Sequence, residues 1–103
     1  MPSSTFLQKK IALVTGASSG IGALTSEYLA AQGLQVILVA RREEKLREIT
    51  NQITSAGGKA IYRVCDLTVD ADRITLFNNL NLDGLLPDIL VNNAGIGWYG
   101  YFH

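Results

Sequence analysis

The chain has 103 residues, 48% of them hydrophobic and 17% charged, and its nine basic and nine acidic residues give a formal net charge of +0. This composition is typical of a folded globular protein and excludes a disordered or fibrous chain, and the length suits one domain. Because the basic residues form no long run, the charge pattern expected of a nucleic-acid-binding protein is missing.

The cysteine content and the lengths of the apolar runs indicate the cellular compartment of the protein. A lone cysteine, Cys65, cannot form an internal disulfide, which favours a reducing compartment. The apolar run after Lys10 stops at Gly16 and is too short for a secretory signal, and no stretch reaches the length of a membrane helix. We expect a cytoplasmic protein without a transmembrane segment, while an organelle or a peripheral membrane association stays open.

The first third of the chain predicts a strand, a helix and a second strand. Residues 10–15 (KIALVT) and 35–40 (QVILVA) are continuous apolar runs rich in β-branched side chains, as in buried parallel strands. Gly33 suits the end of the intervening helix. Apolar residues recur at helical spacing between the strands, namely Ile21, Leu24, Tyr28 and Leu29.

The pattern then repeats. Leu46, Ile49 and Ile53 mark one face of a charged helix that ends at the glycine pair 57–58, and residues 59–65 (KAIYRVC) supply a third, buried strand.

A third helix and a fourth strand follow. Thr68 is the expected helix cap, and Asp70 and Asp72 lie in the first turn, where the helix dipole favours acidic groups. Residues 87–88 break the chain before a fourth strand at 89–91. The inner face of this helix is expected to hold Ile74, Phe77 and Leu80.

Strict alternation of strand and helix predicts an α/β fold with a parallel sheet covered on both faces. We expect a Rossmann-type doubly wound sheet of about four strands in the order 3-2-1-4, with the flavodoxin-like order 2-1-3-4 as the competitor. Residues 1–103 would form a single but incomplete domain, whose fourth strand, Ile89–Val91, is left with an open edge.

The loop after the first strand reads TGASSGIG (15–22). A dinucleotide pyrophosphate requires a tight turn, close backbone approach and close packing of helix on strand, which Gly16, Gly20 and Gly22 would provide in that order. Ser18 and Ser19 would add hydroxyl donors or cap the helix. A plain strand-to-helix turn, the alternative, explains one or two glycines but not three.

The spacing Gly-x-x-x-Gly-x-Gly resembles the classical short-chain dehydrogenase/reductase family. VNNAG at 91–95 is similar to that family's motif at the end of the fourth strand, beside the cofactor ribose. Asp66 and Leu67 resemble the pair that lies against the adenine. Together with the strand end after residue 40, these motifs give the expected cofactor-binding residues: Gly16, Ser18, Ser19, Gly20, Ile21, Gly22, Arg41, Arg42, Asp66, Leu67, Asn92, Ala94 and Gly95.

The end of the second strand indicates which dinucleotide binds. An NAD site places an acidic residue here to hold the ribose hydroxyls, but the chain has Ala40, Arg41 and Arg42. Arginine suits a 2′-phosphate, so the sequence favours NADP(H) over NAD(H), with Arg41 ahead of Arg42. In the alternative, both arginines are solvated and pair with acids of the next helix, Glu43, Glu44 or Glu48.

The resemblance implies hydride transfer between nicotinamide and a carbonyl or alcohol, with a catalytic serine and a Tyr-x-x-x-Lys motif. That motif is absent from the 103 residues, so we assign no catalytic residue. We therefore expect the amino-terminal cofactor half of an oxidoreductase, inactive alone. The alternative is a non-catalytic dinucleotide-binding or interaction module that pairs with a longer relative or with a second copy.

Overall fold

Strands and helices alternate along the chain in a computed structural model, which describes residues 10–93. The alternation predicted from the sequence is confirmed, with strand bounds that differ by one residue. The elements are β1 (Ile11–Thr15), α2 (Gly20–Ala31), β2 (Gln35–Ala40), α3 (Glu43–Ser55), β3 (Lys59–Val64), α4 (Asp70–Leu82) and β4 (Ile89–Asn92).

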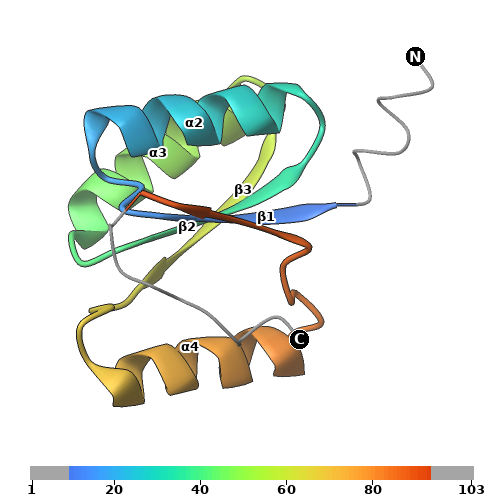
Figure 1. Cartoon of the computed structure of the whole chain (residues 1–103). Coiled ribbons are helices and arrows are strands. Elements are labelled where there is room, and N and C mark those ends of the chain that lie inside the picture. Colours follow the sequence, from blue (N-terminus) through green and yellow to red (C-terminus); the bar gives the residue numbers. More distant parts are fainter. Residues whose placement is uncertain (1–9, 94–103) are drawn as a thin grey trace.

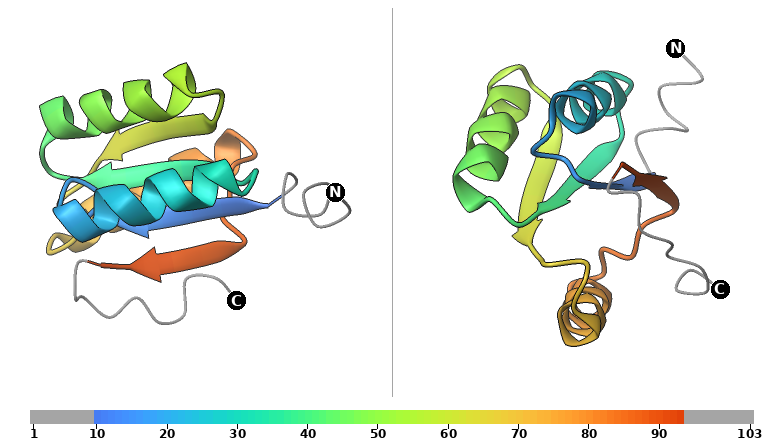
Figure 2. Two further views of the ribbon diagram at one scale, coloured as in Figure 1. Left: turned by 90° about the horizontal axis from the view of Figure 1, so that it is seen from above. Right: turned by 60° about the vertical axis from the view of Figure 1, so that its left-hand side comes forward.

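The four strands form one parallel sheet in the order β3-β2-β1-β4. In its centre, Val14 of β1 pairs with Leu38 of β2 on one side and with Val91 of β4 on the other. Helices α2 and α3 cover one face, and α4 covers the opposite face (Figures 1 and 2). The doubly wound order 3-2-1-4 is therefore confirmed, and the flavodoxin-like order is wrong for this chain.

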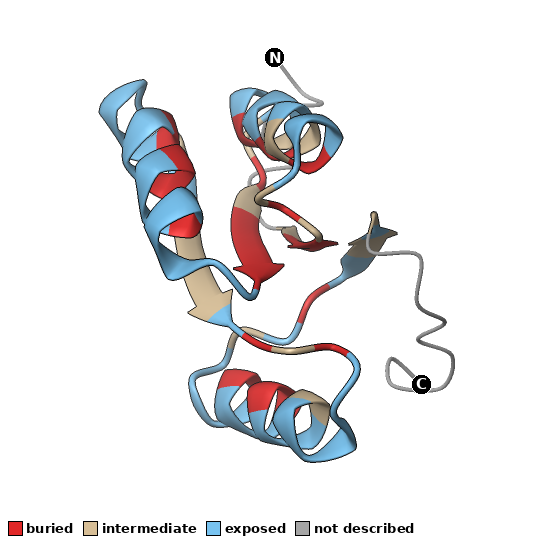
Figure 3. Cartoon of the chain, turned by 90° about the vertical axis from the view of Figure 1, so that its left-hand side faces the viewer, coloured by how far each residue is buried: buried red, intermediate tan, exposed pale blue. Residues whose placement is uncertain are grey.

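The core consists of two apolar layers, one on each face of the sheet. Leu38 packs in the layer under α2 and α3, whereas Ile37 and Val39 pack in the layer over α4 with Phe77 and Leu80. Because successive side chains of a strand point to opposite faces, β1 and β2 are buried on both faces, which is why they form unbroken apolar runs (Figure 3). Burial of Leu46, Ile49 and Ile53 in α3 confirms the predicted inner face of that helix.

Helix α2 forms where predicted, but of the four apolar residues that recur along it only Leu29 packs against the core. Ile21, Leu24 and Tyr28 are 72%, 68% and 64% exposed. The helix instead buries small residues, Gly22, Ser26 and Ala30. These let the helix backbone lie close to β1 and β2, and the buried Ser26 hydroxyl is satisfied by donating to the Gly22 carbonyl at 2.8 Å. Gly33 follows the helix with φ +98°, and the Gly33 and Leu34 amides donate back to the Ala30 and Leu29 carbonyls, which closes the helix end as expected.

Helix α4 also departs from the prediction in two respects. Its N-cap is Val69 rather than Thr68, whose hydroxyl donates to Asp66 Oδ1 at 2.6 Å. Ile74 is 49% exposed, and Leu76 takes its place on the inner face beside Phe77 and Leu80.

The two outer strands of the described sheet are less buried than the inner pair. β3 was predicted to be buried but is only half-buried, because it pairs with β2 alone. Within residues 10–93, β4 pairs with β1 alone, and Ile89 is 38% exposed, in line with the expected open edge. None of the helices in this range has the length and apolar character needed to cross a membrane.

Candidate functional site

The glycine loop joins the end of β1 to the start of α2. Gly16 has φ +60°, a left-handed conformation that favours glycine, so it makes the turn as predicted. Ser19 caps the helix: its hydroxyl accepts from the Gly22 amide at 3.1 Å and donates to the Gly16 carbonyl at 2.8 Å. The loop is thus held by its own side chain, and the amino end of α2 faces the carboxyl edge of the sheet.

The other two glycines of the loop differ in their surroundings. A Cβ atom on Gly22 would lie 2.2 Å from the Gly16 carbonyl oxygen, so this position requires glycine for the helix to pack on the turn. A Cβ atom on Gly20 would meet nothing within 4 Å. Gly20 therefore has open space beside it, which is what close approach of a ligand to the helix start requires.

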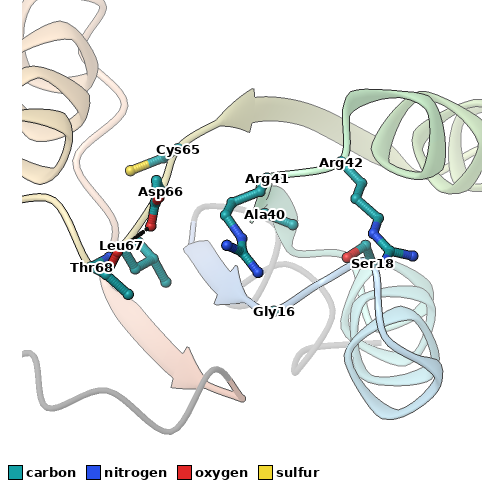
Figure 4. A pocket seen from close by; sticks show the side chains of 9 residues that line it. All are labelled: Gly16, Ser18, Ala40, Arg41, Arg42, Cys65, Asp66, Leu67 and Thr68. Carbon is teal, nitrogen blue, oxygen red and sulfur yellow. Dashed lines mark hydrogen bonds between the residues drawn. The ribbon is translucent and has the colours of Figure 1, made fainter.

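Two exposed arginines, Arg41 and Arg42, stand at the end of β2. Their side chains extend toward the glycine loop, with Asp66, Leu67 and Thr68 on the opposite side (Figure 4). In the described part of the chain neither forms an ion pair, so the predicted alternative of pairing with the acids of α3 is not realised. Glu43 instead lies 3.8 Å from Arg47 and accepts from the Tyr62 hydroxyl at 3.1 Å.

The loop after β3 is tightly hydrogen-bonded. Asp66 Oδ1 accepts from both the hydroxyl and the backbone N–H of Thr68, at 2.6 and 3.0 Å. These bonds, with a smaller contribution from Arg41, hold the pKa of the Asp66 carboxyl below its usual range. Burial raises the pKa of the Cys65 thiol to about 11, so Cys65 is a neutral core residue at neutral pH rather than a nucleophile.

A cavity of about 310 Å³ joins these three strand ends. It brings together six residues predicted to belong to the cofactor site: Gly16, Ser18, Arg41, Arg42, Asp66 and Leu67. Ala40, Cys65 and Thr68 line it as well and were not predicted to bind the cofactor. Their places directly after β2 and β3 are the signal that could have found them, since the carboxyl ends of parallel strands meet at one edge of a sheet.

The other predicted residues lie outside the lining of this cavity. Ser19, Gly20, Ile21 and Gly22 form the helix start beside it, and the Ile21 side chain faces solvent. Asn92 ends β4, and its side-chain oxygen accepts from the Thr15 hydroxyl at 2.9 Å. Ala94 and Gly95 lie outside the described residues.

This arrangement suits an elongated anionic ligand. A helix start with open space presents backbone donors, the arginine pair presents two cations, and Asp66 presents a carboxylate acceptor at the far end. Across residues 10–93 there is no cluster of three or more histidine, cysteine or acidic side chains that could hold a metal ion.

Comparisons with known proteins point to one family. A sequence model of the short chain dehydrogenase family matches residues 10–103. The fatty acyl-CoA reductase of Acinetobacter baylyi is 44% identical over 88 residues, which cover 84% of this chain and 29% of that protein.

Two solved structures have the same fold over most of the chain. A metagenomic short-chain oxidoreductase in complex with NADP superposes with a TM-score of 0.79 at 42% identity, over 88% of this chain and 41% of that one. A variant of the actinorhodin polyketide ketoreductase with NADPH gives 0.77 at 39% identity, over 84% and 33%. The chain spans less than half the length of each of these proteins. With its strand order, its glycine loop and a family match over nearly its whole length, the chain belongs to the short-chain dehydrogenase/reductase family.

Proposed function

We propose that this chain binds a nicotinamide dinucleotide across the carboxyl ends of β1, β2 and β3, with NADP(H) preferred over NAD(H). The observation that carries the proposal is the cavity that Arg41 and Arg42 share with Gly16 and Asp66. Family membership and the NADP and NADPH of the two similar structures support a dinucleotide ligand.

In this proposal the pyrophosphate lies at the start of α2. Glycine at position 20 leaves space for the phosphates, and the first amides of the helix, including that of Ile21, have no earlier turn of helix to bond. Ser18 and Ser19 flank the same approach, and Gly16 and Gly22 keep the turn tight beneath it. Helix dipole and free donors together favour a dianionic group at this place.

The adenosine part would lie between β2 and β3. Asp66 and Leu67 would border the base, and the arginines would hold a phosphate on the adenine ribose. A guanidinium offers paired donors that match phosphate oxygens, and neither of these two forms an ion pair with an acid in residues 10–93. An NAD site would need an acidic acceptor at the end of β2, where this chain has Ala40.

The nicotinamide end of the site would lie beyond β4. Asn92, Ala94 and Gly95 are assigned there on the resemblance of the VNNAG segment to the family motif. When bound, the cofactor would supply hydride chemistry toward a carbonyl or alcohol. The chain contains no Tyr-x-x-x-Lys to serve as a proton donor, so we propose that residues 1–103 form an incomplete domain that binds the cofactor without turnover.

A second candidate is a non-catalytic module that pairs with a longer relative or with a second copy through β4. It is favoured by one observation, the outer edge of β4, which has no strand partner within residues 10–93 and carries the exposed Ile89. A stable monomer that binds NADPH would count against this candidate, and a stoichiometric complex with a longer relative would support it.

The arginine assignment is tested by the double substitution Arg41→Ala with Arg42→Ala. We expect NADPH affinity to fall about tenfold or more, because two charged hydrogen-bond donors are lost, while NADH affinity changes little. Arg47→Ala is the matched control, since Arg47 is an exposed arginine of α3 outside the cavity. Equal losses for NADPH and NADH in the double variant would contradict the preference for NADP(H).

A further inference from the structure

Arg73, in the first turns of α4, reaches back to the loop that borders the cavity. Its Nη1 donates to the Leu67 carbonyl oxygen and its Nη2 pairs with Asp70 Oδ1. The Arg73 side chain is only 16% exposed, against 81% for Asp70. The guanidinium is therefore largely buried where it contacts the loop carbonyl.

Neighbouring groups hold the rest of this loop. The Asp66 amide donates to Asp72 Oδ2 at 3.2 Å, and the Cys65 amide donates to the Ala40 carbonyl at 3.0 Å. The Thr68 amide bonds the Asp66 side chain, and the Val69 amide bonds the Asp66 carbonyl at 3.1 Å. Within residues 10–93 the Leu67 amide forms no hydrogen bond, although its four neighbours from 65 to 69 all do.

Within the described residues, the Leu67 amide is thus a free hydrogen-bond donor, and the peptide groups on either side of it are held by hydrogen bonds. It belongs to the peptide group between Asp66 and Leu67, whose carbonyl is held by Val69. Asp72 holds the peptide group before it, and Arg73 holds the one after it through the Leu67 carbonyl. Because a trans peptide group is planar, its N–H points opposite to its carbonyl, so the bond that holds the Asp66 carbonyl also directs the Leu67 N–H, and the held groups on either side limit its rotation.

We infer that Arg73, assisted by Asp72, is a positioning residue for the base side of the dinucleotide site, where it sets the direction of the Leu67 amide. The inference rests on the proposed function. Arg73 does not line the cavity and acts through the loop. Without it the loop must be ordered when the ligand binds, and that entropic cost lowers the affinity for any ligand that carries adenosine.

This role has a signature that differs from that of the arginines at the end of β2. Loss of Arg73 lowers the affinities for NADPH and for NADH by the same factor, because both ligands carry the same base and the 2′-phosphate is not involved. The ratio of the two affinities is unchanged. Loss of Arg41 and Arg42 changes that ratio.

The chain offers a close control in Arg63. Its Nη1 donates to the Tyr62 carbonyl at 3.1 Å and its Nη2 pairs with Asp83 at 3.2 Å, the same kind of contacts as Arg73 makes, but neither partner lines the cavity. Arg63→Met therefore removes an arginine that bonds a carbonyl and a carboxylate at a distance from the site. Asp72→Ala, at an exposed position, tests the same loop with less effect on folding than Arg73→Met.

The experiment is a fluorescence titration of the 103-residue chain and its variants with NADPH and NADH, with folding followed by circular dichroism. Arg73→Met is expected to lower the affinities for NADPH and NADH about tenfold each, and Arg73→Lys to lower them less. Asp72→Ala should also lower the two affinities by equal factors. Arg63→Met should lower neither by more than about twofold. If Arg73→Met and Asp72→Ala weaken binding no more than Arg63→Met, or change the NADPH to NADH ratio, the positioning role is overturned and the proposed function stands. If the folded wild-type chain binds neither ligand, both are overturned.

Discussion

Gly22 lies so close to the Gly16 carbonyl oxygen that a Cβ atom on it would be 2.2 Å from that oxygen and 2.8 Å from the Ala17 Cα. The atoms in the way belong to the backbone of the turn, which cannot rotate aside as a side chain can. The first turn of α2 and the turn after β1 are therefore one packed unit.

Gly22→Ala is predicted to destabilise the fold. The helix and the turn must separate to admit the methyl group, which costs about 1–3 kcal/mol or more, as in other overpacked interiors. Urea unfolding followed by circular dichroism measures the loss. An unchanged unfolding midpoint would show that the turn relaxes at no cost and would contradict the close packing.

Gly20→Ala is predicted to lower NADPH affinity without lowering the stability of the fold. No atom lies within 4 Å of the added methyl and the position is the first of the helix, so stability is kept or rises slightly. NADPH affinity should fall, because the methyl occupies the space through which the phosphates approach. Unchanged NADPH affinity in this variant would remove Gly20 from the proposed site.

Two leucines of equal size should differ sharply when they are shortened. Leu46 of α3 is fully buried, and Leu46→Ala is expected to cost about 2–5 kcal/mol. Leu24 of α2 is 68% exposed, and Leu24→Ala should change stability by no more than about 0.5 kcal/mol. Comparable losses in urea unfolding would mean that another surface covers α2 in solution.

The outcome for α2 also shows how far the sequence predicts the fold. The unbroken apolar runs of β1 and β2 predicted buried parallel strands correctly, because only burial on both faces permits such runs. Periodicity failed for α2, because it ranks residues by hydrophobicity, whereas close packing on the sheet selected Gly22, Ser26 and Ala30 by size.

The candidate site was predictable where the type of residue at a strand end indicates which ligand group it can bind. Arg41 and Arg42 were predicted in this way and Asp66 by its resemblance to a family motif, and the structure brings all three to one cavity. Arg73 was missed because its contact with Leu67 crosses from a helix to a loop six residues away. Thr68 was misread because a threonine just before a helix predicts a cap, but this helix begins one residue later, with Val69 as its N-cap.

The buried Cys65 thiol should make the protein sensitive to alkali. Its pKa is raised to about 11, while the thiol of an unfolded cysteine has its ordinary pKa of 9.0. Below pH 9 both states hold the proton, and as the pH rises from 9 to 11 the unfolded state ionises first, so stability is lost over that interval. The decline in unfolding free energy should be shallower in Cys65→Ala. Parallel curves for the two proteins would contradict a buried neutral thiol.

The most direct test of the account is a titration of the purified 103-residue chain with NADPH and with NADH, in which nicotinamide fluorescence reports binding and far-ultraviolet circular dichroism reports folding. We predict that the folded chain binds both cofactors, NADPH more tightly, and reduces no carbonyl substrate by itself. A folded chain that binds neither cofactor would contradict the central claim that the cavity between Gly16, Arg41 and Asp66 is a dinucleotide site.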